Sequence, residues 1–514
     1  MNKRGIVLAA LSGLLLATAY RQADWFALTW IAFVPLLMAL DTVQRVRTAY
    51  LFGLVMGIVF YTTAAYWFVN FAQLLKGYPL PQATALSFLF WLYCAQLPAL
   101  LSAVYIWVRK HSGLNEILVF PVFAVVAYAL FPMLFPVQLG ESQSRFLLAT
   151  QATDITGVHG LDFILVLFNT IIFLIVKNSR DALQSRLVFV GLAIIAGWFS
   201  YGAVSLSNWN NKIVNWPTHT IGIVQPNQAP DRHIPPPEPG YTRTYPFEMA
   251  ITEKLADAGA ELVIWPETRF KGYYKETTVN EAYRQQAKNL ATPFIFHDLE
   301  TQGSGKDLKS YHTLVGLDEK GTSVINYRKT KLIAYAESIP FLKNSSTLKK
   351  LMGAYGEGFF KEVTPGEGPT IVNIGGVWLA PVICYEVMFS DYSAQAVAAH
   401  PKGAVLAAVS NNSWFGNSIQ PLQHLNSSIL RAVENRVPLI HVMNNGPSGL
   451  VMPNGELIVQ TEFYEQAGYK ILMPYEESSG GSFYTKNPYL FLYFMYILLL
   501  LLVAMSFKRA LQYK

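Results

Sequence analysis

Eight apolar runs, each long enough to cross the hydrocarbon core of a bilayer, constrain this chain more than any other feature of its sequence. A core of about 30 Å requires about 20 predominantly apolar residues in helical conformation. We therefore predict a multi-pass α-helical membrane bundle. The runs lie at 5–20, 25–41, 50–74, 85–108, 115–137, 160–176, 187–206 and 488–507.

The first run has a second interpretation. It is short, it follows a basic start, and its Ala17-Thr18-Ala19 sequence resembles the cleavage site of a signal peptide. We favour an uncleaved helix because the second apolar run begins almost immediately, at Trp25. Either choice leaves the orientation of the following segments unchanged.

Lysine and arginine in the short loops indicate the orientation of the spans, because cytoplasmic loops carry an excess of both. With the N-terminus inside, only Arg21, Lys76 and Arg145 of the short-loop residues lie outside. We therefore expect both termini in the cytoplasm and residues 207–487 on the other side of the membrane. The cytoplasmic set is Lys3, Arg4, Arg45, Arg47, Arg109, Lys110, Lys177, Arg180, Arg186, Lys508, Arg509 and Lys514.

The charged residues are distributed unevenly. They make up 14% of the 514 residues, against about 25% in an ordinary soluble domain. The deficit lies in the apolar runs, whereas residues 210–485 have the composition of a globular domain. We predict three parts: 1–206 with helices one to seven, 207–487 as an extracytoplasmic catalytic domain, and 488–514 as helix eight and a cytoplasmic tail.

Composition also bounds the partners and cofactors. The net charge is +6, but many of the basic residues flank apolar segments, so we expect no nucleic acid as partner. The nine histidines show no metal-binding spacing, and we expect no metal and no other cofactor. Cys94 lies in an apolar run and Cys384 in the globular part, which makes a disulfide framework implausible.

Short apolar runs alternate with helical patterns in the globular part, which favours a layered α/β fold. Each apolar run ends in residues typical of a strand end, and a hairpin is expected around Asn454-Gly455. We predict helices at 247–258, 279–289 and 422–436. The expected strands are 220–224, 261–265, 293–297, 312–316, 377–383, 404–409 and 438–442, with the hairpin at 451–459.

Three residues are candidates for chemistry. Glu267 follows the apolar segment 262–266, where partial burial raises the pKa of a carboxylate and suits it to act as a base, although an ordinary solvated glutamate is the alternative. Cys384 also follows an apolar strand, and it is either a nucleophile on a strand-to-helix elbow or a small buried hydrophobe. Lys329 lies in a basic run in which Lys331 competes with it.

Together these residues resemble the nitrilase (carbon–nitrogen hydrolase) superfamily, which carries a Glu-Lys-Cys triad in this order on an αββα sandwich. The apolar helices narrow the resemblance to the apolipoprotein N-acyltransferase family, which joins such a domain to eight transmembrane helices. The matching motifs are GLVMGIVFYTTAAYW at 53–67, GVHGLDFILVLFN at 157–169, VQPN at 224–227, WPET at 265–268, the segment 327–340, ICYE at 383–386, NNSWFG at 411–416, QH at 423–424, RAVE at 431–434 and NNG at 444–446.

The resemblance assigns roles to individual residues. The tyrosine-any-lysine spacing selects Lys329 rather than Lys331, and Glu337 matches a second functional glutamate. Tyr385 and Glu386, which follow Cys384 directly, are expected to support the site or bind substrate.

The chain departs from the family pattern at four places. Arg269-Phe270-Lys271 replaces an Ala-any-Pro sequence, and Asn412-Ser413 replaces Asp-Ala. A proline-rich stretch from Pro235 to Pro239 stands where a tryptophan-bearing segment is usual, and the 131–143 loop lacks the expected tryptophan. These changes leave the expected chemistry intact and bear on the substrates.

The resemblance implies an acyltransferase of the bacterial inner membrane with a periplasmic catalytic domain. It would move a fatty acyl chain from a membrane phospholipid, through a Cys384 thioester, to the N-terminal amine of a diacylglyceryl-cysteine lipoprotein. The nearest alternative is a membrane-anchored amidase in which water replaces the amine, and a transporter or scaffold with an inactive domain is a third. The segment from Phe341 to Phe360 mixes lysines with large apolar residues and suits either a membrane-dipping lid or a surface loop.

Overall fold

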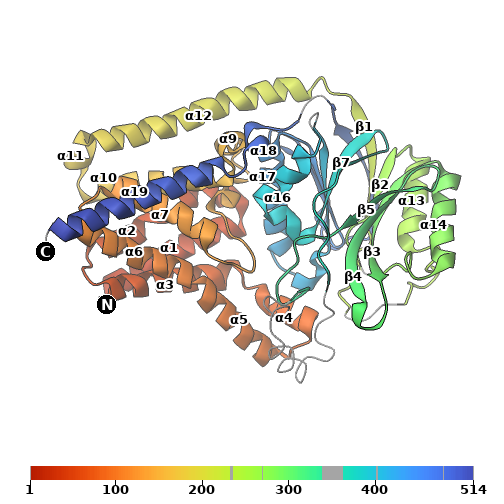
Figure 1. The fold of residues 1–514 in the computed structure, drawn as a ribbon, viewed down its shortest axis with the longest axis horizontal. Helices are drawn as coiled ribbons and strands as arrows, with labels where there is room; N and C mark the ends of the chain where they lie inside the picture. Colours follow the sequence, from red (N-terminus) through yellow and green to blue (C-terminus); the bar gives the residue numbers. More distant parts are fainter. Residues whose placement is uncertain are drawn as a thin grey trace. The chain divides into compact units, whose positions relative to one another are not determined.

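The computed structural model describes residues 2–231, 236–268, 270–338, 363–400, 403–477 and 480–512. It divides into two compact units (Figure 1). The helical unit comprises Met1–Val69, Pro79–Trp209 and Asn487–Lys514. The α/β unit comprises Asn210–Lys486 together with a segment from far upstream, Asn70–Tyr78.

Helices account for the whole of the first unit. Among the described residues, six helical stretches are long and apolar enough to cross a membrane, and α7 and Leu490–Ser506 of α19 are shorter apolar helices. Each of the eight predicted runs overlaps one of these stretches. The helices before β1 and at the C-terminal end are α1 Lys3–Arg21, η1 Ala23–Trp30, α2 Val34–Asp41, α3 Val46–Ala64, α4 Phe68–Lys76, α5 Leu80–Cys94, α6 Gln96–Ser112, α7 Glu116–Leu130, η2 Leu139–Gln143, α8 Leu147–Thr150, α9 Thr153–Thr156, α10 Val158–Lys177, α11 Ser179–Gln184, α12 Arg186–Ile213 and α19 Leu490–Gln512. Most of α4 and the end of α12 belong to the α/β unit.

The third and fourth predicted runs are each interrupted. The third run ends as a span at Ala64, and the chain then turns into α4. At this turn the Ala65 carbonyl accepts from Trp91 Nε1 at 3.0 Å and from the Phe68 N–H at 3.2 Å. The fourth run breaks at Ala95 into α5 and α6, because Pro98 in the first turn of α6 has no N–H to continue the hydrogen bonding of α5. Hydropathy alone does not reveal either of these two breaks, because the residues on both sides of each break are apolar.

Helix α1 is integrated into the helical unit. Ala9, Leu16 and Ala17 are fully buried in its core. A Cβ atom at Gly13 would lie 2.4 Å from the carbonyl oxygen of Met56 in α3, so only glycine permits this close approach of the two helices. This packing joins α1 closely to α3, and whether α1 is retained or cleaved stays a prediction.

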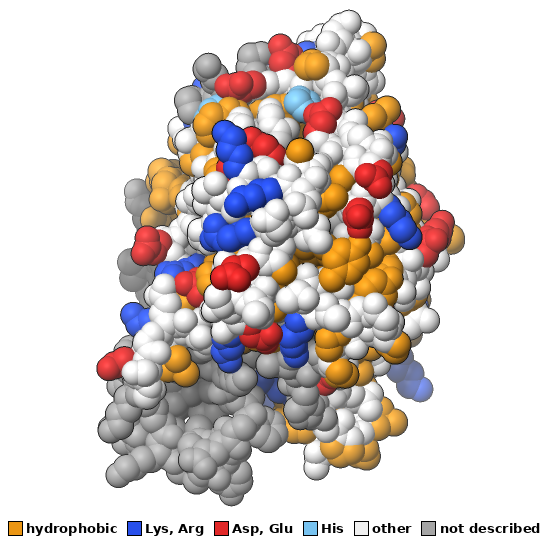
Figure 2. All heavy atoms as spheres, turned by 90° about the vertical axis from the view of Figure 1, so that its right-hand side faces the viewer, with side chains coloured by type: hydrophobic (Ala, Val, Ile, Leu, Met, Phe, Trp, Pro, Cys, Tyr) orange, Lys and Arg blue, Asp and Glu red, His pale blue; other side chains and the backbone are white. Residues whose placement is uncertain are grey.

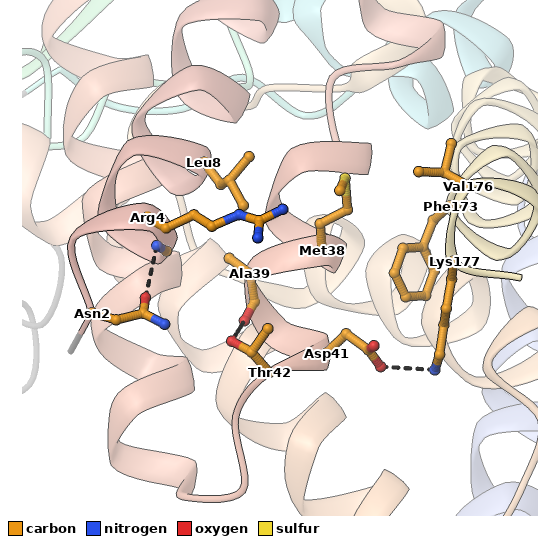
Figure 3. Close-up of a pocket in the computed structure, with 11 residues that line it drawn as sticks. Asn2, Arg4, Leu8, Met38, Ala39, Asp41, Thr42, Phe173, Val176 and Lys177 are labelled. Carbon is orange, nitrogen blue, oxygen red and sulfur yellow. Dashed lines mark hydrogen bonds and ion pairs between the residues drawn. The ribbon is translucent and has the colours of Figure 1, made fainter.

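Five helix ends meet at one end of the helical unit. Lys177, which ends α10, lies 2.7 Å from Asp41 at the end of α2 and 3.4 Å from Glu116 at the start of α7. Arg109 in the last turn of α6 also reaches Asp41, at 3.2 Å. Arg4 of α1 lines a pocket with Asp41 and Lys177 (Figure 3). These are the ends that the loop-charge rule assigns to one common side.

The α/β unit contains two mixed six-stranded sheets. The first has the order β12-β1-β2-β3-β4-β5 and the second β11-β10-β9-β8-β7-β6. In each sheet the central three strands, β1-β2-β3 and β7-β8-β9, are parallel and their flanking strands antiparallel. The strands are β1 Thr218–Gln225, β2 Leu262–Ile264, β3 Phe294–Gln302, β4 Lys309–Leu317, β5 Ser323–Arg328, β6 Val372–Ile374, β7 Val377–Ile383, β8 Val405–Ser410, β9 Leu439–Met443, β10 Gly449–Val451, β11 Leu457–Gln460 and β12 Ala467–Pro474.

Helices cover the outer face of each sheet, which gives the predicted αββα arrangement (Figure 1). Helices α13 (Phe247–Asp257) and α14 (Thr277–Leu290) pack on the first sheet around Trp265. Helices α16 (Ser390–Ala398) and α17 (Gln420–Asn435) pack on the second. On the α13 and α14 side, basic and acidic side chains are interspersed, as on a surface in contact with water (Figure 2). The predicted membrane bundle and nitrilase-like α/β fold are confirmed.

Candidate active site

The three candidate catalytic residues follow strands that end near one another. Glu267 comes three residues after β2, and Lys329 comes directly after β5 in the same sheet. Cys384 comes directly after β7 of the other sheet. The two sheets of the sandwich thus each contribute to one cluster of side chains.

Lys329 lies between two carboxylates. Its Nζ atom is 3.5 Å from Oε1 of Glu267 and 2.7 Å from Oε1 of Glu337. The three triad residues are nearly inaccessible to solvent, with exposed fractions of 8% for Glu267, 1% for Lys329 and 7% for Cys384. Ion pairs in such surroundings are only weakly screened by water.

The surroundings fix the charge states of these groups. Burial and then the Glu267 carboxylate raise the pKa of the Cys384 thiol, and the opposing charge of Lys329 is too small to cancel them. Burial alone would lower the pKa of Lys329, but Glu267 and Glu337 raise it above its usual value. Burial would likewise raise the pKa of Glu337, but Lys329 and then His312 hold it below its usual value. The resting site thus has a neutral thiol that requires a base, beside a permanent cation.

Cys384 lies on the predicted strand-to-helix elbow. It is the first residue of the 3₁₀ helix η5 (Cys384–Met388), and its φ of +50° lies in the left-handed region, which is uncommon for a residue with a side chain. His424 Nε2 donates to the Cys384 carbonyl oxygen at 3.1 Å. This hydrogen bond holds the peptide in the conformation that presents the sulfur.

His424 was not assigned a role from the sequence, although it belongs to the QH motif. Because its Nε2 donates to a carbonyl, its Nδ1 accepts, and Asn412 Nδ2 lies 3.2 Å away as the donor. Asn412 also donates to Gln420 Oε1 at 3.1 Å. Burial lowers the pKa of His424 to about 4, so the ring remains neutral at physiological pH.

Glu386 connects the lysine loop to the cysteine loop. Its Oε1 accepts from the backbone N–H groups of Thr330 at 2.6 Å and Lys331 at 3.0 Å. Its Oε2 accepts from the N–H of Ile383 at 2.7 Å and from the hydroxyl of Tyr327 at 2.6 Å. The carboxylate is fully buried. Glu386 therefore fixes the positions of Lys329 and Cys384 relative to each other.

Tyr385, the last of the predicted site residues, and the competing Lys331 lie in aromatic surroundings. Tyr385 is buried, and its ring packs edge-on against Phe389 with centroids 4.9 Å apart. Lys331 lies over the rings of Phe389 and Tyr392, at 5.3 and 5.6 Å from their centroids, rather than beside Glu267. Arg269 and the segment from Phe341 to Phe360 lie outside the described residues.

The NNSWFG loop contacts the carboxylate of Glu267. The backbone N–H of Asn411 donates to Oε2 of Glu267 at 3.1 Å, while Oε1 faces Lys329. Asn444 Nδ2 donates to Oδ1 of Asn411 at 3.0 Å. On the other side of the loop, Asn70 Nδ2 donates to the carbonyl of Phe415 at 3.2 Å, and Phe71 stacks on the Phe415 ring. The Asn70–Tyr78 segment thus supports the loop that holds Glu267.

One group among the described residues has the spacing of a metal site, namely Glu267, His297 and His312. His297 Nε2 lies 3.1 Å from His312 Nδ1, so the two rings hydrogen-bond to each other. The Lys329 ammonium already occupies the position of a cation beside Glu267. This donor set therefore fits an internally paired cluster better than a metal centre.

Comparison with known proteins finds a family match in each of the two units. Residues 12–171 match the family of the apolipoprotein N-acyltransferase N-terminal domain, and residues 220–469 match the carbon-nitrogen hydrolase family. The chain belongs to the apolipoprotein N-acyltransferase family. This confirms the family predicted from the sequence, and with it an acyltransferase of lipoprotein biosynthesis and a membrane protein.

Relatives cover nearly the full length of this N-acyltransferase family member. The apolipoprotein N-acyltransferase of Geobacter metallireducens is 26% identical over 90% of this chain and 88% of its own length. That of Chlorobaculum tepidum is 26% identical over 94% and 92%. Among solved structures, a mutant of the Nesterenkonia AN1 amidase, of the nitrilase superfamily, has 18% identity and a TM-score of 0.35 over 51% of this chain and 92% of that one.

Proposed function

We propose that this protein transfers a fatty acyl chain from a membrane phospholipid, through a thioester on Cys384, to the N-terminal amine of a diacylglyceryl-cysteine lipoprotein. The observation that carries the proposal is a buried, protonated Cys384 thiol beside Glu267 and Lys329, in a chain whose described residues include six candidate membrane spans. A lipid ester and a lipidated amine both reside in a bilayer.

The first half-reaction forms the thioester. Glu267 removes the Cys384 proton, and the thiolate attacks the ester carbonyl. The Lys329 ammonium, with backbone N–H groups near Cys384, stabilises the oxyanion. When the tetrahedral intermediate collapses, the C–O bond breaks and the lysophospholipid oxygen takes the proton from Glu267. The acyl group remains on sulfur.

The second half-reaction uses the same groups. The acceptor amine attacks the thioester carbonyl while Glu267 takes a proton from nitrogen. Collapse breaks the C–S bond, and the thiolate recovers the proton from Glu267. The complete cycle begins and ends with a protonated Cys384 thiol and with Glu267 able to accept a proton, so it requires no cofactor.

We further propose that the α/β unit faces the periplasm and both termini the cytoplasm. The support is the common end of the helical unit at which Arg4, Arg109 and Lys177 lie together, since cytoplasmic helix ends are rich in basic residues.

The alternative is a hydrolase in which water attacks the thioester. The test is mass spectrometry of lipoprotein N-termini from bacteria with and without this protein. We expect a third fatty acid only when the protein is present. Unchanged N-termini together with release of free fatty acid by the purified protein would favour the hydrolase.

A further inference from the structure

A cavity of about 230 Å³ in the α/β unit lies beside the candidate active site. Its walls come from the loop before α13, the start of α13 and the chain just after Glu267. The lining residues that matter here are Tyr241, Phe247, Glu248, Phe270, Lys271 and Asn411. None of the triad residues lines it.

Asn411 connects the cavity to the base. Its backbone N–H donates to Oε2 of Glu267 at 3.1 Å, and the same residue lines the cavity. Phe270 and Lys271 follow Glu267 by only three and four residues. The backbone of Lys271 is fixed because its N–H donates to Oδ1 of Asp298 at 2.7 Å. A ligand in the cavity therefore lies next to the group that would deprotonate the acceptor amine.

The lining is unsuited to a hydrocarbon chain. Lys271 and Glu248 form a buried ion pair with side chains 8% and 1% exposed, and Gln228 Nε2 donates to Glu248 at 2.9 Å. Arg243 lies 5.4 Å from the Phe270 ring centroid, and its Nε is 3.7 Å from Glu276. Acyl chains that displaced water from these groups would incur a desolvation cost without making hydrogen bonds.

The same lining suits a peptide. Tyr241, Phe247 and Phe270 offer aromatic faces, and Gln228, Thr242 and Asn411 offer polar groups. Binding sites for ligands of mixed character combine apolar walls with a few placed polar groups in this way. Phe270 and Lys271 also lie where the chain departs from the family pattern.

We propose that this cavity binds the polypeptide that directly follows the N-terminal cysteine of the acceptor lipoprotein. The proposal rests on the proposed acyl transfer. The acceptor amine must reach Glu267 and Cys384, and each extended residue beyond it advances the peptide by about 3.3–3.6 Å. The residues that follow the acceptor cysteine would therefore extend from Glu267 into the cavity that Asn411 lines.

The test separates the two half-reactions in Phe270→Ala and Tyr241→Ala proteins, purified at full length. Acylation of Cys384 by phospholipid alone should keep the wild-type rate. Transfer to a diacylglyceryl-cysteine peptide several residues long should lose about tenfold in kcat/KM, mainly through KM, as for loss of an aromatic anchor. Transfer to diacylglyceryl-cysteine amide, which has no following residue, should not change, and Phe270→Tyr should restore the peptide reaction.

Phe483→Ala, an exposed phenylalanine of the same unit outside the cavity, is the matched control and should behave as wild type. Equal losses with the peptide and the truncated acceptor would overturn the proposal, as would slower acylation by phospholipid, which would assign the cavity to the donor. Failure of the wild type to form any acyl-enzyme would instead refute the proposed function.

Discussion

Nε2 of His424 lies 3.1 Å from the carbonyl oxygen of Cys384, and this hydrogen bond holds Cys384 in a left-handed backbone conformation. The ring acts on the peptide bond and not on the sulfur. A neutral imidazole is required, because Nδ1 accepts from Asn412. His424 is therefore a positioning residue whose protonation would disrupt the elbow.

The stability of the folded protein should therefore depend on the protonation state of His424. The pKa of His424 is lowered to about 4 in the folded protein, below the ordinary value near 6.5, so the unfolded state binds more protons between these pH values. The free energy of unfolding should therefore fall as pH drops from about 6.5 towards 4. In detergent, thermal melting of His424→Gln should depend less on pH over this interval than that of the wild type. Burial also lowers the pKa values of His297 and His441, so their contribution to the pH dependence of stability should remain in this variant. An unchanged slope would contradict the assignment.

The acyl-enzyme itself provides the most direct prediction. Incubated with phospholipid and no acceptor, the wild type should gain one acyl chain that neutral hydroxylamine removes. Glu267→Gln keeps the shape but loses the base, and adduct formation should slow by about 10²–10⁴-fold. Intact-mass measurement checks both. An adduct that persists in Cys384→Ala would refute the mechanism.

The two neighbouring lysines provide a matched pair. Lys329→Met should slow adduct formation by about 10²–10³-fold, as for the loss of one oxyanion donor. Lys331→Met should have little effect, because Lys331 lies over Phe389 and Tyr392 instead of beside Glu267. The same mass measurement compares them. The reverse pattern would show that the lysine has been assigned wrongly.

Substitutions of the two cysteines should have different effects on acyl transfer activity. Cys94 is buried at the end of α5 in the helical unit and behaves there as a small hydrophobe. Cys94→Ala should therefore retain most of the acyl transfer activity, measured with a lipoprotein peptide. Loss of activity in a variant that still purifies as a folded protein would assign Cys94 a role that we do not foresee.

Orientation can be tested with reporter fusions. Fusions after Ser207 and near Tyr484 should report the periplasmic side, and a fusion after Lys508 the cytoplasm. An inside signal from either of the first two would reverse the orientation and remove the access of Cys384 to periplasmic acceptors.

The sequence was most informative where a residue's neighbours in the chain decide its environment. Glu267 and Cys384 follow continuous apolar strands, so the strand ends and the burial could be predicted. Strand β5, which positions Lys329, alternates between buried and more accessible residues and was not predicted as a strand. The lysine was selected by resemblance, because its charge partners come from other loops.

The contacts that complete the site join residues far apart in sequence. His424 reaches Cys384 from α17, forty residues later, and Asn411 reaches Glu267 from the other sheet. Helix α17 is buried on every side, so its pattern cannot show which side chain faces the nucleophile. Only the assembled sandwich brings these groups together.

The Asn70–Tyr78 segment has a consequence for biogenesis. It is translated long before the rest of the α/β unit. Asn70 and Phe71 can contact Phe415 only after the loop that also contacts Glu267 has been synthesised. The α/β unit is therefore not encoded by one continuous stretch of the chain. A fragment comprising 207–487 would lack this support, whereas the same fragment supplied with the upstream part of the chain could be complemented.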